Sequence, residues 1–215
     1  MKKALIFDLD GTLLDTLEDL RDSVNHALAL CGCPERSLEE VRAFVGNGAE
    51  LLMRRALPEG SQAFPEAFAA FKAHYAANCR NKTAPYPGIL DALQALGQKF
   101  QLAIVSNKPD FAVKALCAEL FPGIPAWGEM PGIPRKPAPD MLELALKELG
   151  AKSCIYIGDS EVDVQTAKNA GAKCLSVTWG FRDRQALEAA GAEHFCHSPR
   201  ELETAIERMF LTHGK

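Results

Sequence analysis

The chain has 215 residues with 47% hydrophobic and 24% charged side chains, and its formal net charge is −4. These are ordinary globular values, so they argue against a disordered, collagenous or coiled-coil protein. The negative net charge predicts no nucleic-acid partner, and the apolar runs are too short to cross a membrane, so we expect no membrane partner either.

A short apolar run at residues 4–7 predicts a buried parallel strand, because it ends at acidic residues and Gly11. Asp8 and Asp10 stop this run too early for an export signal. Without such a signal the seven cysteines are expected to be reduced thiols, which predicts a cytoplasmic protein.

Between residues 16 and 82 the apolar residues recur at the spacing of helices, and no strand pattern is present. Thr16 and Asp19 match the capping box, in which a hydroxyl satisfies a free N–H at a helix start, and so do Ser37 and Glu40. The segment Gly46-Asn47-Gly48 separates two of these helices. Four aromatic residues recur at helical spacing, namely Phe64, Phe68, Phe71 and Tyr75. We interpret them as part of the hydrophobic core, without a chemical role.

After residue 83 the patterns of strands and helices alternate. The predicted strands lie at residues 102–105, 154–157 and 174–177. The predicted helices lie at residues 138–149 and 160–170. This alternation predicts an α/β fold with a Rossmann-like, doubly wound parallel sheet. Residues 1–15 and 83–215 are expected to form this core, and residues 16–82 a small helical domain inserted after the first strand.

Two aspartates directly follow the first predicted strand. Asp8 and Asp10 are two residues apart, so on an extended strand their side chains point the same way. Two carboxylates about 4 Å apart repel by about 4 kcal/mol at an effective dielectric constant of 20, and such a pair needs a cation or a shared proton. A hairpin turn at Asp10-Gly11 is the alternative, but the residues after Gly11 favour a helix start.

A second acidic segment, at residues 158–163, also follows a strand and opens a helix. Ser160 and Asp163 have capping-box spacing, which explains both residues but leaves Asp159 without a structural role. Ligands of an open parallel sheet lie beyond the carboxyl ends of its strands, so both acidic segments are expected at that edge. Oxygen ligands of this kind suit Mg²⁺, which we predict as the cofactor.

Two further segments are expected at the same edge. Ser106 and Asn107 follow a predicted strand and offer a hydroxyl and backbone N–H groups at a helix start, a pattern that a plain N-cap also explains. Lys136 lies just ahead of the next helix, between Arg135 and Pro137. Loop cations are usually solvated, but prolines fix the backbone beside Lys136 and favour a helix start.

These segments together resemble the haloacid dehalogenase-like hydrolases, which mostly transfer phosphoryl groups. The resemblance covers nearly the whole chain and rests on four motifs in the family's order, namely Asp8-Leu9-Asp10-Gly11-Thr12, Ser106, Lys136 and Gly158 to Asp163. The inserted helical segment looks like the small cap of that family. Three stretches are similar to the phosphoglycolate phosphatases, namely Val45 to Leu51, Pro87 to Leu90 and Thr178 to Phe181.

The resemblance implies a role for each motif. Asp8 is implied as the nucleophile that forms an aspartyl phosphate, and Asp10 as the acid and base for the leaving group and the attacking water. Mg²⁺ is implied between an Asp8 oxygen, the Asp10 backbone carbonyl and Asp159, and Asp163 is implied as an outer partner of the metal site. The groups implied to surround the phosphoryl oxygens are Ser106, the Asn107 backbone and Lys136.

The function expected from this resemblance is Mg²⁺-dependent hydrolysis of a small phosphomonoester, with 2-phosphoglycolate as the predicted substrate, by a monomer or homodimer. A phosphosugar mutase of the β-phosphoglucomutase type is the alternative enzyme. The cap of those mutases carries an arginine soon after a Val-Gly pair, whereas the first arginine after Val45-Gly46 here is Arg54. A non-enzymatic phospho-aspartate switch of the receiver type is the third hypothesis, but such modules are much shorter and phosphorylate an aspartate on a middle strand.

Overall fold

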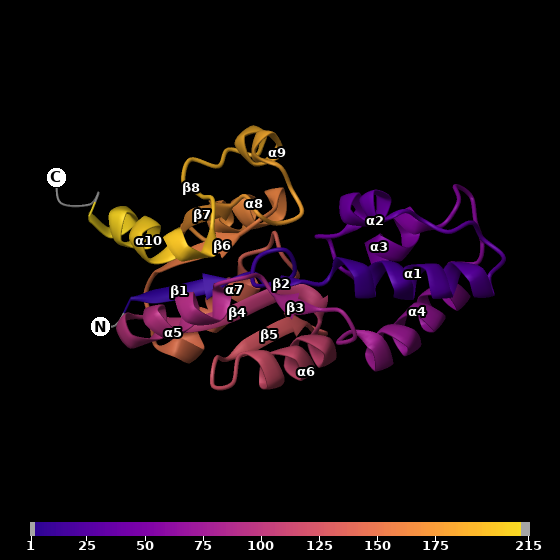
Figure 1. Cartoon of the computed structure of the whole chain (residues 1–215), viewed down its shortest axis with the longest axis horizontal. Helices are drawn as coiled ribbons and strands as arrows, with labels where there is room; N and C mark the ends of the chain where they lie inside the picture. Colours follow the sequence, from indigo (N-terminus) through magenta and orange to yellow (C-terminus); the bar gives the residue numbers. More distant parts are fainter. Residues whose placement is uncertain (1–2, 212–215) are drawn as a thin grey trace.

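The computed structural model describes residues 3–211 and is built on a six-stranded sheet in which each strand runs parallel to its neighbours (Figure 1). The strand order is β5-β4-β1-β6-β7-β8, so β1 lies inside the sheet between β4 and β6. The strands are β1 (Ala4–Phe7), β4 (Gln101–Pro109), β5 (Ala126–Glu129), β6 (Cys154–Gly158), β7 (Lys173–Val177) and β8 (Phe195–Cys196). The α/β fold class predicted from the alternating pattern is confirmed.

Helices cover both faces of the sheet, because the central strands are apolar on both sides. Leu5 and Phe7 of β1 pack in one layer, whereas Ala4 and Ile6 pack in the other, and all four are fully buried. The first layer contains α5 (Ile89–Lys99), α6 (Asp110–Leu120) and α10 (Leu202–Leu211). The second layer contains α7 (Asp140–Leu149) and α8 (Glu161–Asn169). Two short helices lie near the end of the chain, α9 (Arg184–Ala189) and η1 (Pro199–Glu201).

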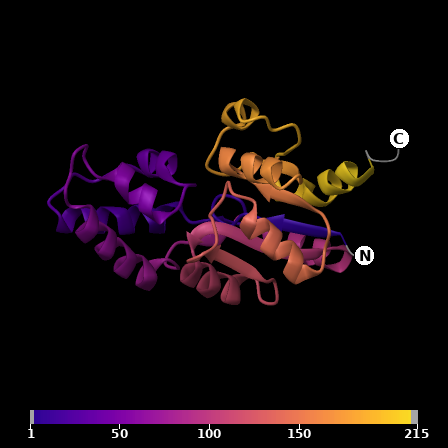
Figure 2. The same cartoon turned by 180° about the vertical axis from the view of Figure 1, so that it is seen from behind.

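Four helices gather beyond the carboxyl end of β1, as the front and back views show (Figures 1 and 2). They are α1 (Leu17–Leu30), α2 (Leu38–Phe44), α3 (Ala49–Ala56) and α4 (Phe64–Asn78), and we call them the helical unit. Most of the residues in their buried apolar cluster come from these four helices, including Val24, Met53 and Phe71. The helical unit therefore has an apolar core largely separate from the two layers on the sheet.

The chain leaves for the helical unit and returns from it at neighbouring points. β2 (Leu14–Asp15) pairs with β3 (Ala84–Pro85) in a short antiparallel ribbon. The carboxylate of Asp19 also accepts hydrogen bonds from the backbone N–H groups of Lys82 and Thr83, which fastens the start of α1 to the returning chain. We propose a division into a core of residues 1–15 and 83–215 and an inserted unit of residues 16–82.

One of the two capping boxes predicted within the helical unit is present and the other is not. The Ser37 hydroxyl accepts from the Glu40 N–H at 3.2 Å, and the Glu40 carboxylate accepts from the Ser37 N–H at 2.8 Å. The box predicted at Thr16 was wrong, because the Thr16 hydroxyl makes no cap hydrogen bond. The carboxylate of Asp19 is occupied by the returning chain instead.

Candidate active site

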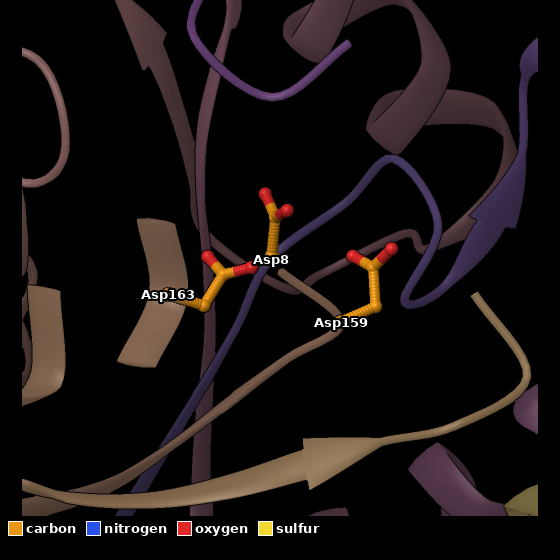
Figure 3. A group of neighbouring side chains, drawn as sticks. All are labelled: Asp8, Asp159 and Asp163. Carbon is orange, nitrogen blue, oxygen red and sulfur yellow. The ribbon is translucent and has the colours of Figure 1, made fainter. Parts of the chain in front are cut away.

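Three aspartates from two neighbouring strand ends meet in the interior (Figure 3). Asp8 directly follows β1, Asp159 directly follows β6, and Asp163 lies in the first turn of α8. One carboxylate oxygen from each lies within 4.8 Å of the others, and all three residues are buried. We call these three residues the aspartate cluster. The structure thus brings Asp8 and Asp159 to one sheet edge, where parallel strands place their ligands.

The aspartate cluster contains more negative charge than its one contacting ammonium neutralises. Lys136 Nζ lies 2.9 Å from Asp8 Oδ1 and 2.8 Å from Asp163 Oδ1. Burial raises the pKa of the Asp8 carboxyl to about 7, although Lys136 acts in the opposite direction. Burial, followed by the charges of Asp163 and Asp8, raises the pKa of Asp159 well above its usual range. An additional cation beside these carboxyls would therefore favour their ionised form.

Two hydrogen bonds and two neighbouring glycines fix the orientation of the Asp159 side chain. Its carboxylate accepts from the Phe181 N–H at 2.7 Å and from the Thr12 hydroxyl at 3.1 Å. Gly11 has a φ of +82°, and a Cβ atom at Gly11 or Gly180 would collide with the Asp159 side chain. Close approach of two glycines therefore lets this carboxylate lie against the loops after β1 and β7.

Asp163 supports the aspartate cluster from the start of α8. Its carboxylate accepts from the Ser160 N–H at 3.1 Å and from the Ser160 hydroxyl at 2.6 Å. Its other oxygen lies 2.8 Å from Lys136 Nζ and accepts from the Tyr156 hydroxyl at 3.0 Å. Four donors therefore contact the Asp163 carboxylate. Asp8 Oδ1, in contrast, forms an ion pair with Lys136 but accepts no well-aligned hydrogen bond.

The donor set of the aspartate cluster fits a hard divalent cation. All the candidate ligands are carboxylate oxygens, which suit Mg²⁺ better than softer metals. The incompletely bonded oxygen of Asp8 and the excess of carboxylates over ammonium groups both favour such an ion. Asp10 does not contribute its side chain to this cluster, and the backbone carbonyl predicted for it remains a prediction.

Ser106 and Asn107 lie within β4, and this corrects the expected helix start. The strand continues to Pro109 with an irregular register after Val105, and α6 begins only at Asp110. The Ser106 hydroxyl lines the cavity and accepts from the Lys108 N–H at 3.3 Å. A helix N-terminus therefore does not supply the anion-binding N–H groups expected at this position.

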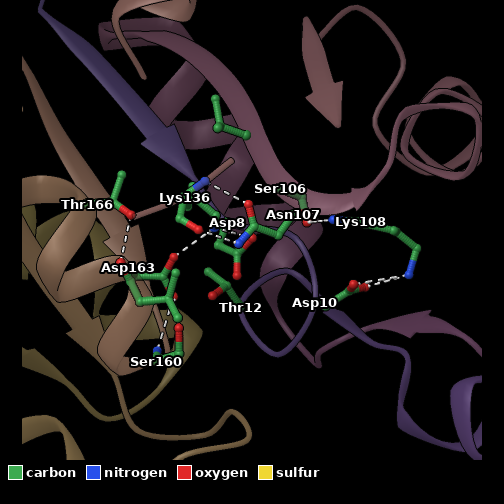
Figure 4. Close-up of polar contacts among 12 residues, drawn as sticks. Asp8, Asp10, Thr12, Ser106, Asn107, Lys108, Lys136, Ser160, Asp163 and Thr166 are labelled. Carbon is green, nitrogen blue, oxygen red and sulfur yellow. Dashed lines mark hydrogen bonds and ion pairs between the residues drawn. The ribbon is translucent and has the colours of Figure 1, made fainter. Parts of the chain in front are cut away.

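The side chain of Asn107 joins three segments instead of pointing at a ligand (Figure 4). Its carbonyl accepts from the Lys136 N–H at 2.9 Å, and its amide donates to the Lys136 carbonyl at 2.9 Å. The same amide donates to the Gly46 carbonyl of the helical unit at 3.1 Å. Asn107 therefore holds the Lys136 backbone in place and contacts the helical unit at the same time.

Two residues of the site were missed from the sequence. Lys108 Nζ donates to both carboxylate oxygens of Asp10, at 2.8 and 3.1 Å, and also to the hydroxyl of Tyr75. Tyr75 is fully buried as the aromatic stripe predicted, but its hydroxyl reaches the site, so the prediction of no chemical role was incomplete. The position of Lys108 directly after Ser106-Asn107 was the available signal.

A small cavity that opens to solvent lies between the sheet edge and the helical unit. The sheet side presents polar groups, including Asp8, Asp10, Ser106 and Lys136. The helical unit lines the opposite side mainly with apolar side chains, namely Leu20, Val45, Ala49, Leu52 and Phe71. This division suits a small ligand with one strongly charged end at the sheet edge.

Residues 5–177 match the family model described as haloacid dehalogenase-like hydrolase. The chain therefore belongs to the haloacid dehalogenase-like hydrolase family, as the four ordered motifs predicted. Within residues 3–211, none of the helices combines the length and apolarity needed to span a bilayer.

Several relatives are described as phosphoglycolate phosphatases. One from Pseudomonas putida is 35% identical over 204 residues, covering 88% of this chain and 74% of its own. One from Cereibacter sphaeroides is 33% identical, covering 95% and 98%. A crystal structure of a candidate phosphoglycolate phosphatase from Lactobacillus delbrueckii subsp. bulgaricus is 40% identical, with a TM-score of 0.89 and coverage of 96% and 99%.

A further solved structure is similar in fold and contains a phosphoryl-type anion. CbbY from Rhodobacter sphaeroides was crystallised in complex with phosphate, is 27% identical and has a TM-score of 0.77, with coverage of 96% of this chain and 100% of its own. A protein of this fold therefore binds phosphate, which is relevant to the ligand expected at the aspartate cluster.

Proposed function

We propose that this hydrolase releases inorganic phosphate from a small phosphomonoester and that 2-phosphoglycolate is its substrate. The observation that carries the proposal is the meeting of Asp8, Lys136 and Asp159 at one sheet edge, beside a cavity that the helical unit covers. The substrate follows from the relatives described as phosphoglycolate phosphatases, three of which are 33–40% identical over most of the chain.

The reaction divides into two transfers at Asp8. In the first, an Asp8 oxygen attacks phosphorus, the ester P–O bond breaks, and the departing alkoxide takes a proton from Asp10. In the second, Asp10 takes a proton from water, which attacks the aspartyl phosphate and releases inorganic phosphate with free Asp8. The buried position of Asp8 beside Lys136 supports this role, because the ammonium offsets the charge that the phosphoryl group brings.

The phosphoryl oxygens are proposed to bind three groups at the end of β4 and before α7. Ser106 offers its hydroxyl, Lys136 its ammonium, and Asn107 its backbone N–H, because its side chain already has three hydrogen bonds. Phosphoryl transfer relies mainly on positioning and charge neutralisation, so rigid placement of these groups matters more than their number.

Mg²⁺ is proposed as the cation of the site, held by an Asp8 oxygen, the Asp10 backbone carbonyl and Asp159. Asp163 orients this set through its contact with Lys136. When bound, the ion supplies positive charge that offsets the phosphoryl oxygens and stabilises the ionised carboxylates.

The helical unit is proposed to act as a cap that covers the substrate and limits access of water. Its apolar side chains face the cavity, and its loop at Gly46 contacts the core through Asn107. We further propose that the protein works in the cytoplasm as a monomer or homodimer, on a free small molecule and without nucleic acid or membrane.

A panel of small phosphate esters, assayed for released phosphate with and without Mg²⁺, tests the proposal. Asp8→Asn should lower phosphate release from 2-phosphoglycolate by at least about a thousandfold, because an amide is a poor nucleophile of nearly the same shape. Asp22→Asn is the matched control, since Asp22 pairs with Arg21 and Lys82 away from the cavity.

Three results would contradict the proposal. Steady phosphate release by Asp8→Asn would remove the nucleophile. Isomerisation of a sugar phosphate without phosphate release would favour the mutase, and a stable aspartyl phosphate without turnover would favour the switch. Release from other esters but never from 2-phosphoglycolate would correct the substrate alone.

A further inference from the structure

A second ion pair lies in the cavity, apart from the aspartate cluster (Figure 4). Lys108 Nζ is 2.8 Å from one carboxylate oxygen of Asp10 and 3.1 Å from the other, so one ammonium holds both oxygens. Only 1% of the Lys108 side chain and 13% of the Asp10 side chain are exposed. The two transfers proposed for Asp8 and Asp10 leave this buried lysine without a role.

The third partner of Lys108 comes from the helical unit. Lys108 Nζ donates to the hydroxyl of Tyr75 on α4 and lies 4.8 Å from the centre of its ring. Lys108 belongs to β4 in the core, so the ammonium joins the two parts of the chain at Asp10. Tyr75 is itself buried in the apolar core of the helical unit, which fixes its hydroxyl.

The hydrogen-bonding capacity of Lys108 shows whether it positions Asp10 or binds the substrate. An ammonium has three N–H donors, and those of Lys108 are directed at the two Asp10 oxygens and the Tyr75 hydroxyl. No donor is left for a substrate. Burial acts to lower the pKa of Lys108, but Asp10 and Tyr75 together raise it. The geometry thus directs Lys108 at Asp10 rather than at a ligand.

We infer that Lys108 and Tyr75 are positioning residues that hold the Asp10 carboxylate where it exchanges protons, and that Tyr75 makes this position depend on the docked helical unit. The inference rests on the acid and base role proposed for Asp10. The ammonium also stabilises the carboxylate left when Asp10 gives its proton to the leaving group.

The leaving group of the substrate reveals whether Lys108 acts through Asp10. An alkoxide needs a proton as its P–O bond breaks, whereas the acetate released from acetyl phosphate does not. Acetyl phosphate is also similar in size to 2-phosphoglycolate and passes the same phosphoryl group to Asp8. Loss of a well-placed acid therefore slows transfer from an alkyl ester and spares transfer from acetyl phosphate.

The experiment measures kcat/KM of the full chain with Mg²⁺ for three substrates: 2-phosphoglycolate, glycerol 2-phosphate and acetyl phosphate. Lys108→Met should lower kcat/KM at least about tenfold for both alkyl esters, part of the hundredfold or more that acid–base catalysis contributes, and at most about threefold for acetyl phosphate. Asp10→Asn should show the same selectivity. The double variant should lose no more than Asp10→Asn alone, because both changes remove one function.

Tyr75→Phe provides a second variant that removes a single hydroxyl. It should lower kcat/KM for the alkyl esters about threefold, with acetyl phosphate unchanged. Lys147→Met is the matched control, because Lys147 is an exposed lysine on α7, and all three substrates should keep the parent values.

Two outcomes would overturn the inference. If Lys108→Met and Tyr75→Phe both lowered kcat/KM equally for acetyl phosphate and the two alkyl esters, Lys108 and Tyr75 would have only a structural role. A loss confined to 2-phosphoglycolate would mean that Lys108 binds the substrate carboxylate. If Asp10→Asn is selective and Lys108→Met is not, only the inference fails, whereas an inactive parent chain contradicts the proposed function itself.

Discussion

At the residue scale, Lys136 determines how three buried carboxylates coexist. Its ammonium contacts Asp8, Asp163 and the hydroxyl of Tyr156, at 2.9, 2.8 and 2.8 Å. Its side chain is almost fully buried, so water does not screen these contacts. Removing one partner of a buried ion pair leaves uncompensated charge, which typically costs about 3–5 kcal/mol.

Lys136→Met should therefore lower the free energy of unfolding by about 3 kcal/mol or more in the presence of a chelator. Adding Mg²⁺ should stabilise this variant more than the parent, because the cation takes over charge neutralisation of the aspartate cluster. Urea unfolding, followed with chelator and with excess Mg²⁺, measures both effects.

Lys99→Met is the control for this prediction. Lys99 pairs with Glu203 and Glu207 on the surface, where water screens the charges and an ion pair adds little stability. If Lys136→Met loses no more stability than Lys99→Met, or if Mg²⁺ stabilises the parent equally, then Lys136 does not balance the cluster.

Three of the residues found from the sequence lie at or near the carboxyl end of a strand: Asp8 and Asp159 directly follow β1 and β6, and Ser106 lies in the last part of β4. Asp8, Ser106 and Asp159 could be predicted at one edge because parallel strands end together. Lys108 was missed because its contact with Asp10 depends on β4 continuing past Val105, which local spacing does not reveal. The hydroxyl of Tyr75 was missed because its contact with Lys108 depends on how α4 packs against the core.

At the element scale, two local patterns of the same spacing had different outcomes in the helical unit. Ser37 and Glu40 form their capping box, because Arg36 occupies one carboxylate oxygen of Glu40 and leaves the other free for the Ser37 N–H. Asp19 has the same spacing from Thr16, but it lies beside the backbone of Lys82, more than 60 residues away in sequence. Tertiary contacts of this kind are absent from a local pattern, so the capping box at Thr16 was wrongly predicted, whereas the one at Ser37 was confirmed.

The packing of α1 against α4 predicts a pH dependence of stability. His74 of α4 stacks on His26 of α1 at 4.2 Å, and its Nδ1 lies 3.0 Å from the Ser23 hydroxyl. Burial lowers the pKa of His74 below its usual 6.5, and His26 lowers it further, whereas Asp22 acts in the opposite direction. The unfolded chain therefore binds a proton first, so stability falls as the pH drops through 6.5.

His74→Gln should remove this contribution. The loss in Tm between pH 7.5 and pH 5.5 is expected to be smaller for His74→Gln than for the parent, measured by thermal unfolding. His197→Gln is the control for the substitution itself, because His197 contacts Thr178 next to the sheet, away from α1 and α4. A parent-like loss in His74→Gln would contradict the prediction.

At the scale of the whole molecule, the core holds the helical unit over the cavity through side chains of core loops and strands. Arg182, which follows β7, donates to the carbonyls of Arg42 at 2.9 Å and Val45 at 2.7 Å. Asn107 donates to the carbonyl of Gly46 in the same loop. Arg182 also pairs with Glu161 at the start of α8, which fixes the guanidinium. The docked position thus depends on the Arg182 guanidinium and the Asn107 amide, which donate to backbone carbonyls at the end of α2 and in the loop after it.

Arg182→Ala should loosen this docking without touching the aspartate cluster. Hydrogen bonds from charged donors contribute about 1.5–3 kcal/mol each, so kcat/KM for 2-phosphoglycolate should fall at least about tenfold, and amide hydrogen exchange should rise at residues 45–48. Arg182→Lys should recover only part of the loss, because an ammonium lacks the planar fork that reaches two carbonyls. Arg184→Ala serves as the control, since Arg184 pairs with Glu188 on the surface of α9. Parent-like kinetics and exchange in Arg182→Ala would show that other contacts hold the helical unit in place.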